Sequence, residues 1–450
     1  MKRRAYESSP IPSQMEHAQY AFGVRDYIRY ENLLDSIRWD INDFVDWVAS
    51  DNPRTKYRNL ITQSGGDTSD YPENALETVF YPTNKIRLPV NKENVIKSGL
   101  VKEKDSDLIL DYIDIDLPES IITKNQIMML DILANNNWER PIYFTGGSYE
   151  ESEYIWMKDY LQLDGLVYKL VPIKTSIENN PYEMGRIDSD LMYDIVKKWS
   201  WGKSESDEIY HDPETRKNSI SFRGNLSRLS EKLISEGEYE KAEEILDLAF
   251  SKMPIDYYGY YSLWTPLVKS YYDIGKSEKV REIVQKLSFK YSDRLSYFSS
   301  LEIFNQYDVG EEIISDIERF RNLIETIQES GEREILADQI KSFISSSEQF
   351  NYIYGEYDYY ISLSNFLISL LELNELEYSM SVIDKIEEQL IRRVSVFSNI
   401  DEEEQVYYLE GITSDINQYS RLINQIEVYD IDAYNKYDKN LKDMLARMIE

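Results

Sequence analysis

The pattern of apolar and polar residues along the chain changes at about residue 174. Before this point, short apolar segments of strand and helix character are separated by turns rich in proline, glycine and asparagine. After a polar segment, apolar residues recur at helical spacing up to the C-terminus. The pattern predicts a small mixed α/β domain followed by an all-α helical array.

The N-terminal domain is expected to pack around a segment in which a buried helix turns into a buried strand. Thr123 and Gln126 have the spacing of a capping box, which starts the helix. Three asparagines at 135–137 end it, because asparagine tolerates the left-handed conformation found at helix ends. Pro141 favours an extended chain, so residues 142–144 are predicted to form the buried strand.

Further helices and strands are predicted around this segment. A helix at 37–48 places five apolar residues on one face, namely Ile37, Ile41, Phe44, Val45 and Val48. Residues 85–90 form a short strand, expected at a sheet edge because of Pro89. A second helix and the strand 166–173 follow the corner. The alternation of strands and helices from 108 to 173 predicts a layer with some parallel pairing.

The strand at 111–117 carries an acidic pair that resembles a metal site. Asp114 and Asp116 alternate with apolar residues, so their carboxylates project to the same solvent-facing side. Such a pair after an apolar strand is able to share a divalent cation, as in metal-dependent nucleotide-sugar transferases. The alternative is an ordinary solvated face, which a chain this acidic offers often. We expect no metal and keep Asp114 and Asp116 as the candidate ligands.

From Gly224 onward, the spacing of small and apolar residues matches a helical repeat. The first helix pair follows the tetratricopeptide pattern at Leu226, Leu229, Leu233, Gly237, Tyr239, Ala242, Leu246, Ala249 and Pro254. A second pair turns at Gly275, and a third, degenerate pair turns at Asn374. Long helices are also predicted at 310–329, 332–346, 402–428 and 433–448. Such pairs stack into an array that serves as a scaffold or as a peptide-binding groove. The candidate groove residues are Asn225, Arg228, Tyr239, Trp264 and Tyr271.

Composition and charge exclude several classes of function. The 450 residues carry 82 acidic against 50 basic side chains, and this net charge of −32 argues against nucleic acid or an anionic membrane as partner. The chain has no cysteine, which excludes disulfides, thiolate catalysis and cysteine-bound zinc. No stretch is long and apolar enough to cross a bilayer. We therefore expect no cofactor, no nucleic-acid partner and no direct membrane insertion.

These changes of pattern divide the chain into four segments. Prolines punctuate a connector arm at 1–30, and the small α/β domain occupies 31–174. A linker with one amphipathic helix follows at 175–222. The tetratricopeptide-like helical repeat domain occupies 223–450.

Four segments of the N-terminal half carry a resemblance to a known family. They read NNNWERPIYF at 135–144, YLQLDGLVYKLVPIK at 160–174, DWVASDNPRTK at 46–56 and LPVNKENV at 88–95. Together they resemble the soluble tail of Bacteroidetes multi-pass membrane proteins, a family similar to the animal transmembrane protein O-mannosyltransferases of the GT-C type. The resemblance covers residues 1–254, and the later helices only in kind.

The resemblance implies a non-catalytic role for this chain. In that family, the catalytic acidic residue and the site for the lipid-linked sugar lie in a membrane half that has no counterpart here. We expect an extracytoplasmic, periplasmic tail, present as a truncated or excised fragment, that binds the polypeptide acceptor beside the family's membrane half. Asp51, Arg54, Trp138, Glu139 and Arg140 lie in the matched segments and are candidates for a binding or interdomain contact.

Two alternative hypotheses concern the same residues. In the first, the chain is a free-standing tetratricopeptide-type adaptor that binds another protein. In the second, it is a metal-dependent glycosyltransferase that uses Asp114 and Asp116. The last hypothesis requires binding of manganese and a sugar nucleotide, both lost when either aspartate is replaced.

Overall fold

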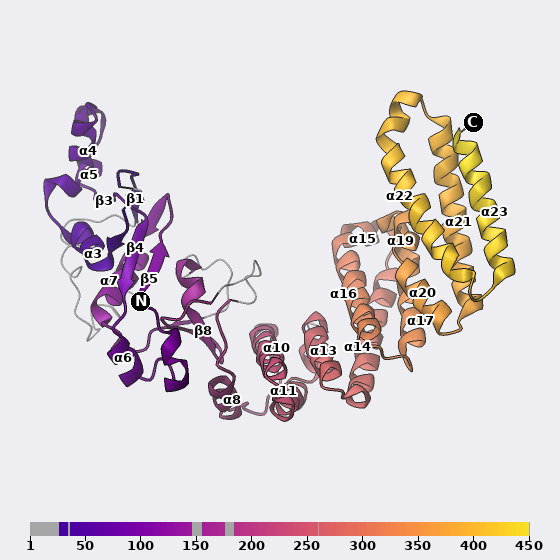
Figure 1. Ribbon diagram of the computed structural model, residues 1–450, viewed down its shortest axis with the longest axis horizontal. Helices are drawn as coiled ribbons and strands as arrows, with labels where there is room; N and C mark the ends of the chain where they lie inside the picture. Colours follow the sequence, from indigo (N-terminus) through magenta and orange to yellow (C-terminus); the bar gives the residue numbers. More distant parts are fainter. Residues whose placement is uncertain (1–26, 35–36, 146–154, 176–183, 260, 450) are drawn as a thin grey trace. The chain divides into compact units, whose positions relative to one another are not determined.

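The computed structural model describes residues 27–34, 37–145, 155–175, 184–259 and 261–449. Contacts divide the chain into an N-terminal unit, Met1–Ser200, and a C-terminal unit, Trp201–Glu450. The first unit is mixed α/β and the second is helical (Figure 1), which confirms the predicted fold class. The boundary between the two units falls inside the segment 175–222 that we assigned to a linker.

The expected connector arm at 1–30 lies outside the described residues except for its last four. Tyr27–Tyr30 form strand β1, so the assignment of these four residues to the arm is wrong. Ile28 is completely buried, and β1 has a hydrogen-bonded neighbour on each side. Burial and pairing together hold this segment in the fold.

The described residues of the N-terminal unit contain three small sheets of three strands each. The first has the order β3-β1-β6, where β3 is Phe80–Tyr81 and β6 is Ile121–Thr123. The second has the order β2-β4-β5, with β2 Trp39–Asp40, β4 Lys85–Pro89 and β5 Tyr112–Asp116. The third has the order β7-β9-β8, with β7 Tyr143–Thr145, β9 Val167–Leu170 and β8 Leu161–Asp164.

Strand pairing differs from the prediction in two respects. Among the described residues, the strands between 108 and 173 form antiparallel strand pairs, with one isolated parallel bridge from Gln162 of β8 to Arg186. The parallel strand pairs are β1 with β3 and β2 with β4. Strand β4 is the central strand of its sheet and not an edge strand as predicted. Pro89 is its last residue, so the residues before it keep their N–H groups for hydrogen bonds to both neighbouring strands. The antiparallel register sets Arg87 opposite Asp114 and Lys85 opposite Asp116, and opposite charges across a ladder stabilise that register.

The first long helix begins later than predicted. Helix α3 spans Ile41–Ala49, and the side chain of Asp40 caps it by accepting a hydrogen bond from the backbone N–H of Asn42. Ile41, Phe44, Val45 and Val48 are buried as expected. Ile37 precedes the cap and is 48% exposed, so its assignment to this helical face is wrong.

The helix predicted before the corner is confirmed, whereas the strand predicted after it is not buried. Helix α7 spans Lys124–Asn136 and has the predicted capping box. It ends with Asn137 at φ 45° and Trp138 at φ 60°, both in the left-handed region. Strand β7 follows but lies at the edge of its sheet, and Tyr143 is 49% exposed. The strand is therefore not buried, because β9 covers only one of its two edges.

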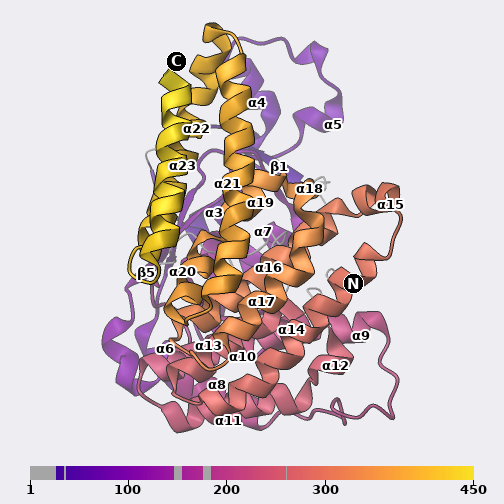
Figure 2. The same cartoon turned by 90° about the vertical axis from the view of Figure 1, so that its right-hand side faces the viewer.

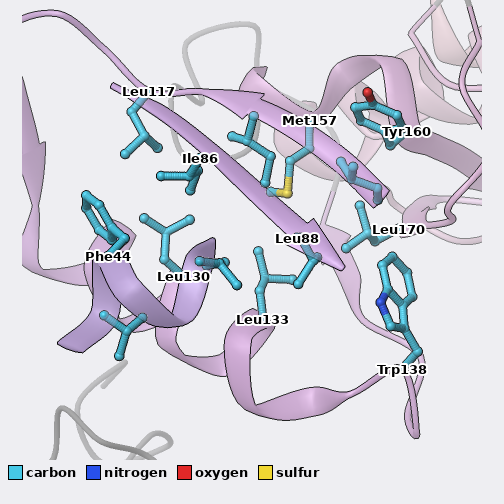
Figure 3. Packing of buried hydrophobic residues seen from close by; sticks show 14 of the residues in the cluster. Phe44, Ile86, Leu88, Leu117, Leu130, Leu133, Trp138, Met157, Tyr160 and Leu170 are labelled. Carbon is cyan, nitrogen blue, oxygen red and sulfur yellow. The ribbon is translucent and has the colours of Figure 1, made fainter. Parts of the chain in front are cut away.

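One hydrophobic core joins these elements. Its members come mainly from α3, β4, β5 and α7 and from the segment 157–173, which includes strands β8 and β9 of the third sheet. Figure 3 shows Phe44, Leu88, Leu133, Met157 and Trp138 around this core. The remaining elements of the unit are η1 Pro53–Thr55, α4 Tyr57–Gln63, η2 Thr68–Asp70, α5 Glu73–Leu76, α6 Lys92–Lys97, η3 Glu103–Leu108, η4 Ile155–Tyr160 and α8 Ser189–Lys197.

The C-terminal unit is an array of packed helices. Its shorter elements are α9 Pro213–Lys217, α12 Ile255–Tyr258, η6 Tyr261–Trp264, α15 Ile303–Asp308, η7 Glu348–Phe350, α18 Asn351–Tyr354 and α19 Glu356–Ile361. The longer ones are α10 Ser219–Ser235, α11 Tyr239–Lys252, α13 Thr265–Asp273, α14 Ser277–Ser299, α16 Gly310–Glu329, α17 Leu336–Ser347, α20 Ser364–Glu372, α21 Leu376–Asn399, α22 Glu402–Ile426 and α23 Ile431–Ile449. Figure 2 shows α21, α22 and α23 side by side, and contacts join all three. Among the helices of the described residues, none combines the length and apolarity needed to cross a membrane.

The turns within the helix pairs share one conformation. Gly237, Gly275 and Asn374 have φ values of 80°, 73° and 64°, and each stands at the predicted turn. The next amide reaches back five residues in each case, as in the bond of 2.9 Å from Glu238 to the carbonyl oxygen of Leu233. This is the hydrogen bond of a Schellman motif, which ends the first helix of each pair.

Helices α16 and α17 form another pair that the repeat pattern did not identify. Gly331 turns the chain with φ 75°, but α17 begins only at Leu336 rather than at the predicted residue 332. Glu332 is buried and binds Arg281 of α14 with an Oε2–Nε distance of 3.3 Å. Its carboxylate also accepts the N–H of Glu334, which holds the connection in a non-helical form.

Candidate functional site

A pocket lies between β1, α4 and α5 in the N-terminal unit. Its volume is about 200 Å³, and the lining residues are Tyr27, Arg29, Tyr57, Ile61, Tyr71, Ala75, Leu76 and Thr78. We call it the tyrosine pocket, because three of these side chains are tyrosines. Figure 1 shows α4 and α5 at one end of this unit, next to β1 and β3.

Alternation along β1 builds one wall of the tyrosine pocket. Ile28 points into the core and is completely buried, so Tyr27 and Arg29 project from the opposite face of the strand. Both of these side chains line the pocket. The burial of Ile28 thus determines that Tyr27 and Arg29 both face the pocket.

The opposite wall is held together by ion pairs. Arg58 of α4 binds Glu73 and Glu77, with 3.0 Å between its Nε and Oε1 of Glu77. These bonds join α4 to the segment that contains α5. The Tyr57 N–H also donates to the carbonyl oxygen of Thr78 at 3.1 Å. The lining residues of α4 and α5 are therefore fixed relative to each other.

A hydrogen bond keeps Tyr57 of the pocket in the neutral phenol form. The Tyr57 hydroxyl donates to Oε1 of Glu31 at 2.6 Å. Burial and this carboxylate raise the pKa of Tyr57 far above its ordinary value. Arg29 donates to the Tyr27 hydroxyl at 3.5 Å, and this contact raises the pKa of Arg29. The site presents neutral hydroxyls, one guanidinium and a carboxylate behind Tyr57, a set suited to binding by stacking and hydrogen bonds.

The sequence did not identify this pocket, because its residues come from separate segments. The 38 tyrosines of the chain are spread along it, so no single tyrosine stands out. The one local signal is the alternation of Tyr27, Ile28 and Arg29, which is typical of a strand with one polar face. That signal lay inside the range assigned to the connector arm.

The candidates near the helix-to-strand corner do not form one site. Trp138 is buried and donates from Nε1 to the carbonyl oxygen of Pro89 at 2.7 Å. Glu139, Arg140 and Asp51 are exposed. The cavity beside Trp138 has a volume of about 10 Å³, which leaves room for one water molecule at most.

Arg54 stands apart from that corner. It is exposed, and its guanidinium carbon lies 5.6 Å from the centre of the Trp47 ring. Among the described residues, no hydrogen bond or ion pair joins Asp51 or Arg54 to Trp138, Glu139 or Arg140. The structure therefore places these five candidates in two separate turns.

The acidic pair on β5 is bound by arginines. Arg87 binds Asp114 through Nε at 2.7 Å and Nη2 at 3.0 Å, a bidentate contact. Arg38 binds Asp116 through Nη2 at 2.7 Å and approaches Asp114 at 3.6 Å. The hydrogen bond from Arg87 lowers the pKa of Asp114. Both carboxylates thus have cationic partners, and within the described part of the chain no cluster of three or more metal-type ligands occurs.

Two of the candidate groove residues are core residues. Trp264 is completely buried, stacks on Phe250 with 4.2 Å between ring centres, and has the guanidinium of Arg223 at 4.2 Å. Tyr271 is also buried and donates to Oδ1 of Asp247 at 2.6 Å. Their assignment to an accessible groove is wrong, because both side chains of the second helix pair pack against α10 and α11 of the first pair.

The other groove candidates are more accessible. Tyr239 is exposed, and Asn225 and Arg228 are half-buried. Elsewhere in the array, a hollow of about 370 Å³ lies between the turn at Gly331 and helix α20. Its lining is largely polar and consists of Gln328, Gly331, Glu332, Arg333, Leu336, Asn365, Ile368, Ser369, Glu372 and Leu373.

Comparison with known families gives one finding. Residues 1–191 match the family model of the TMEM260-associated domain 2. No curated protein and no solved structure matches this chain. The match covers less than half of the chain, includes the tyrosine pocket, and ends before the helical array. It agrees with the resemblance to O-mannosyltransferase-like membrane proteins, and residues 1–191 are similar to the TMEM260-associated domain.

Proposed function

We propose that this chain is the non-catalytic part of a membrane-bound, O-mannosyltransferase-like protein glycosyltransferase and that it binds the polypeptide acceptor. The observation that carries this proposal is the match of residues 1–191 to the TMEM260-associated domain. In this proposal, the chain belongs to the periplasmic side of a bacterial inner membrane, and the family's membrane half is its partner.

The chemistry of the N-terminal unit supports binding rather than bond formation. The tyrosine pocket offers neutral hydroxyls and one guanidinium, and the carboxylate of Glu31 is bound to Tyr57. Arg38 and Arg87 occupy the carboxylates of Asp114 and Asp116, so a cation at this pair has to displace two arginines. These contacts favour the accessory role over the metal-dependent transferase.

The helical array supports an acceptor that is bound in extended form. Packed helix pairs expose long continuous surfaces on which an extended polypeptide is held by side-chain and backbone contacts. The polar hollow lined by Arg333 and Glu372 offers charged and amide side chains to such a polypeptide. In this proposal the array binds the acceptor chain, and the N-terminal unit binds the membrane half.

A binding measurement tests this proposal. The full 450-residue chain is titrated into fluorescently labelled, unglycosylated peptides rich in serine and threonine, and anisotropy is recorded. We expect saturable binding with a dissociation constant on the order of 10–100 μM. Arg333→Ala is expected to weaken it severalfold, whereas the matched surface variant Arg392→Ala is not. Absence of binding by every peptide in the set overturns the acceptor-binding role.

The free-standing adaptor is the second candidate function, and one observation favours it. The helical array occupies residues 201–450, outside the segment that matches the family model. An adaptor binds its peptide without any effect on sugar transfer. Peptide binding combined with unchanged glycosylation by the family's membrane half therefore favours the adaptor.

A further inference from the structure

We propose that the tyrosine pocket binds one neutral pyranose ring, so that the chain recognises a polypeptide that already carries a sugar. This inference rests on the proposed acceptor-binding function and adds a second ligand class to it. It places the sugar contact on β1, α4 and α5 of the N-terminal unit.

The dimensions of the pocket favour a single sugar ring. Its volume of about 200 Å³ is below the range of roughly 300–1,000 Å³ that takes drug-sized ligands. A polypeptide in extended form needs a groove several residues long, whereas this pocket is compact and bounded by three short elements. A monosaccharide is the ligand of matching size that a glycosylated acceptor supplies.

The aromatic rings supply an apolar surface of the kind that sugar rings use. One side of a pyranose is formed by C–H groups, which pack against aromatic rings, while its hydroxyls stay hydrated or hydrogen-bonded at the rim. Tyr71 is 50% exposed and lines the pocket. Tyr57 is fixed from behind by Phe80, whose ring centre lies 5.5 Å from its own.

The charges around the pocket favour a neutral ligand over an anion. Arg29 is the cation of the lining, and Glu31 lies behind Tyr57 with its carboxylate bound to the phenol. A phosphate beside Arg29 also meets the field of this carboxylate, which opposes its binding. A neutral sugar is not repelled by this carboxylate. Its hydroxyls can donate hydrogen bonds to the tyrosine hydroxyls, and they can accept hydrogen bonds from the tyrosines and from the guanidinium.

The pocket is organised before any ligand binds. Ile28 anchors one wall in the core, and the backbone hydrogen bond of 3.1 Å from the Tyr57 N–H to the carbonyl oxygen of Thr78 joins the segments of the other wall. Little conformational entropy is then lost on binding, which matters for a ligand with so few atoms.

Ligand-observed nuclear magnetic resonance tests the proposal with the full chain. The probes are methyl glycosides of glucose, mannose and galactose, and saturation transfer from the protein is measured. We expect at least one glycoside to bind with a dissociation constant on the order of 1 mM. Tyr71→Ala is expected to weaken binding about tenfold, a typical loss for one aromatic contact. Arg29→Met is a second variant at an exposed position, and Tyr407→Ala on α22, where the side chain is 85% exposed, is the matched control outside the pocket.

Each outcome decides for or against the sugar site. Binding that is weakened by Tyr71→Ala and by Arg29→Met but not by Tyr407→Ala supports it. Absence of saturation transfer at about 20 mM of every glycoside, binding unaffected by Tyr71→Ala, or a preference for glucose 6-phosphate overturns it. If unglycosylated peptides bind in the acceptor assay while glycosides do not, only the sugar site is lost. If glycosides bind while unglycosylated peptides do not, the acceptor-binding function is wrong and the sugar site stands.

Discussion

The indole of Trp138 donates a hydrogen bond of 2.7 Å to the carbonyl oxygen of Pro89. This bond joins the turn after helix α7 to the end of strand β4, and the two residues are 49 positions apart in sequence. Trp138 also has a positive φ of 60°, so the corner holds a bulky residue in the left-handed region. The bond and the burial of the ring offset that strain.

Replacement of Trp138 is expected to destabilise the N-terminal unit without affecting ligand binding elsewhere. Trp138→Phe removes the N–H donor and is expected to cost about 1–2 kcal/mol, and Trp138→Ala about 3–5 kcal/mol. Urea unfolding followed by near-ultraviolet circular dichroism measures both. Glu139→Gln is the control at an exposed neighbour, with an expected effect within about 0.5 kcal/mol. Equal stability of Trp138→Ala and the wild type contradicts the role of this residue in the core.

The ion pair of Asp114 with Arg87 predicts a defined pH dependence. The folded-state pKa of Asp114 is lowered by the hydrogen bond from Arg87, so the pair stabilises the fold above the unfolded-state pKa of about 3.9. That contribution is lost as the pH falls from this value through the lower folded-state pKa. Asp114→Asn is expected to cost about 1 kcal/mol at pH 7, and the difference from the wild type shrinks at pH 3.

The control for this pair is Asp111→Asn. Asp111 binds Lys92 at 2.8 Å, but its side chain is highly exposed, and such pairs contribute little. Unfolding free energies at pH 7 and pH 3 are compared for the three proteins. A stability difference between Asp114→Asn and the wild type that is as large at pH 3 as at pH 7 is incompatible with the proposed ion pair.

Trp264 and Tyr239 distinguish core from surface in the helical array. Trp264 is buried under Phe250 and Arg223, so Trp264→Ala is expected to cost about 3–5 kcal/mol. Tyr239→Ala, at an exposed position, is expected to change stability by no more than about 0.5 kcal/mol. Far-ultraviolet circular dichroism during urea unfolding measures the loss of helix. If both variants behave alike, the burial of Trp264 in this array is wrong.

The turn between α16 and α17 depends on the conformation of one glycine. Gly331 has a φ of 75°, which costs other L-residues about 1–2 kcal/mol. Gly331→Ala is therefore expected to lower the melting temperature, whereas Asn374→Gly, at the turn with φ 64°, is expected to cause no loss. Differential scanning calorimetry compares the two. A melting temperature of Gly331→Ala equal to that of the wild type argues against the left-handed turn.

The features that the sequence predicted well are those determined by local contacts. The capping box of Thr123 and Gln126 marks the start of α7, because its hydrogen bonds lie within four residues. The turns at Gly237, Gly275 and Asn374 were predicted for the same reason, since a left-handed residue between two helices has a strong local signature.

The features that the sequence missed depend on distant residues. The central position of β4 follows from its pairing with β2 on one side and with β5 on the other, where Arg87 binds Asp114 27 residues away. The burial of Trp264 follows from the neighbouring helices, and the tyrosine pocket brings together Tyr27, Tyr57 and Tyr71 from separate elements. Such contacts leave no periodic pattern in a single sequence, so only the three-dimensional arrangement reveals them.

Sugar transfer in a divided system tests the central claim most directly. Membranes that carry an O-mannosyltransferase-like membrane protein from which the soluble tail has been removed are incubated with acceptor protein, and the sugar added to the acceptor is measured by intact mass spectrometry. The three arms are the membranes alone, the 450-residue chain alone, and both together. The account predicts little transfer in the first arm, none in the second and restored transfer in the third. Transfer by the chain alone, or no difference between the first and third arms, contradicts it.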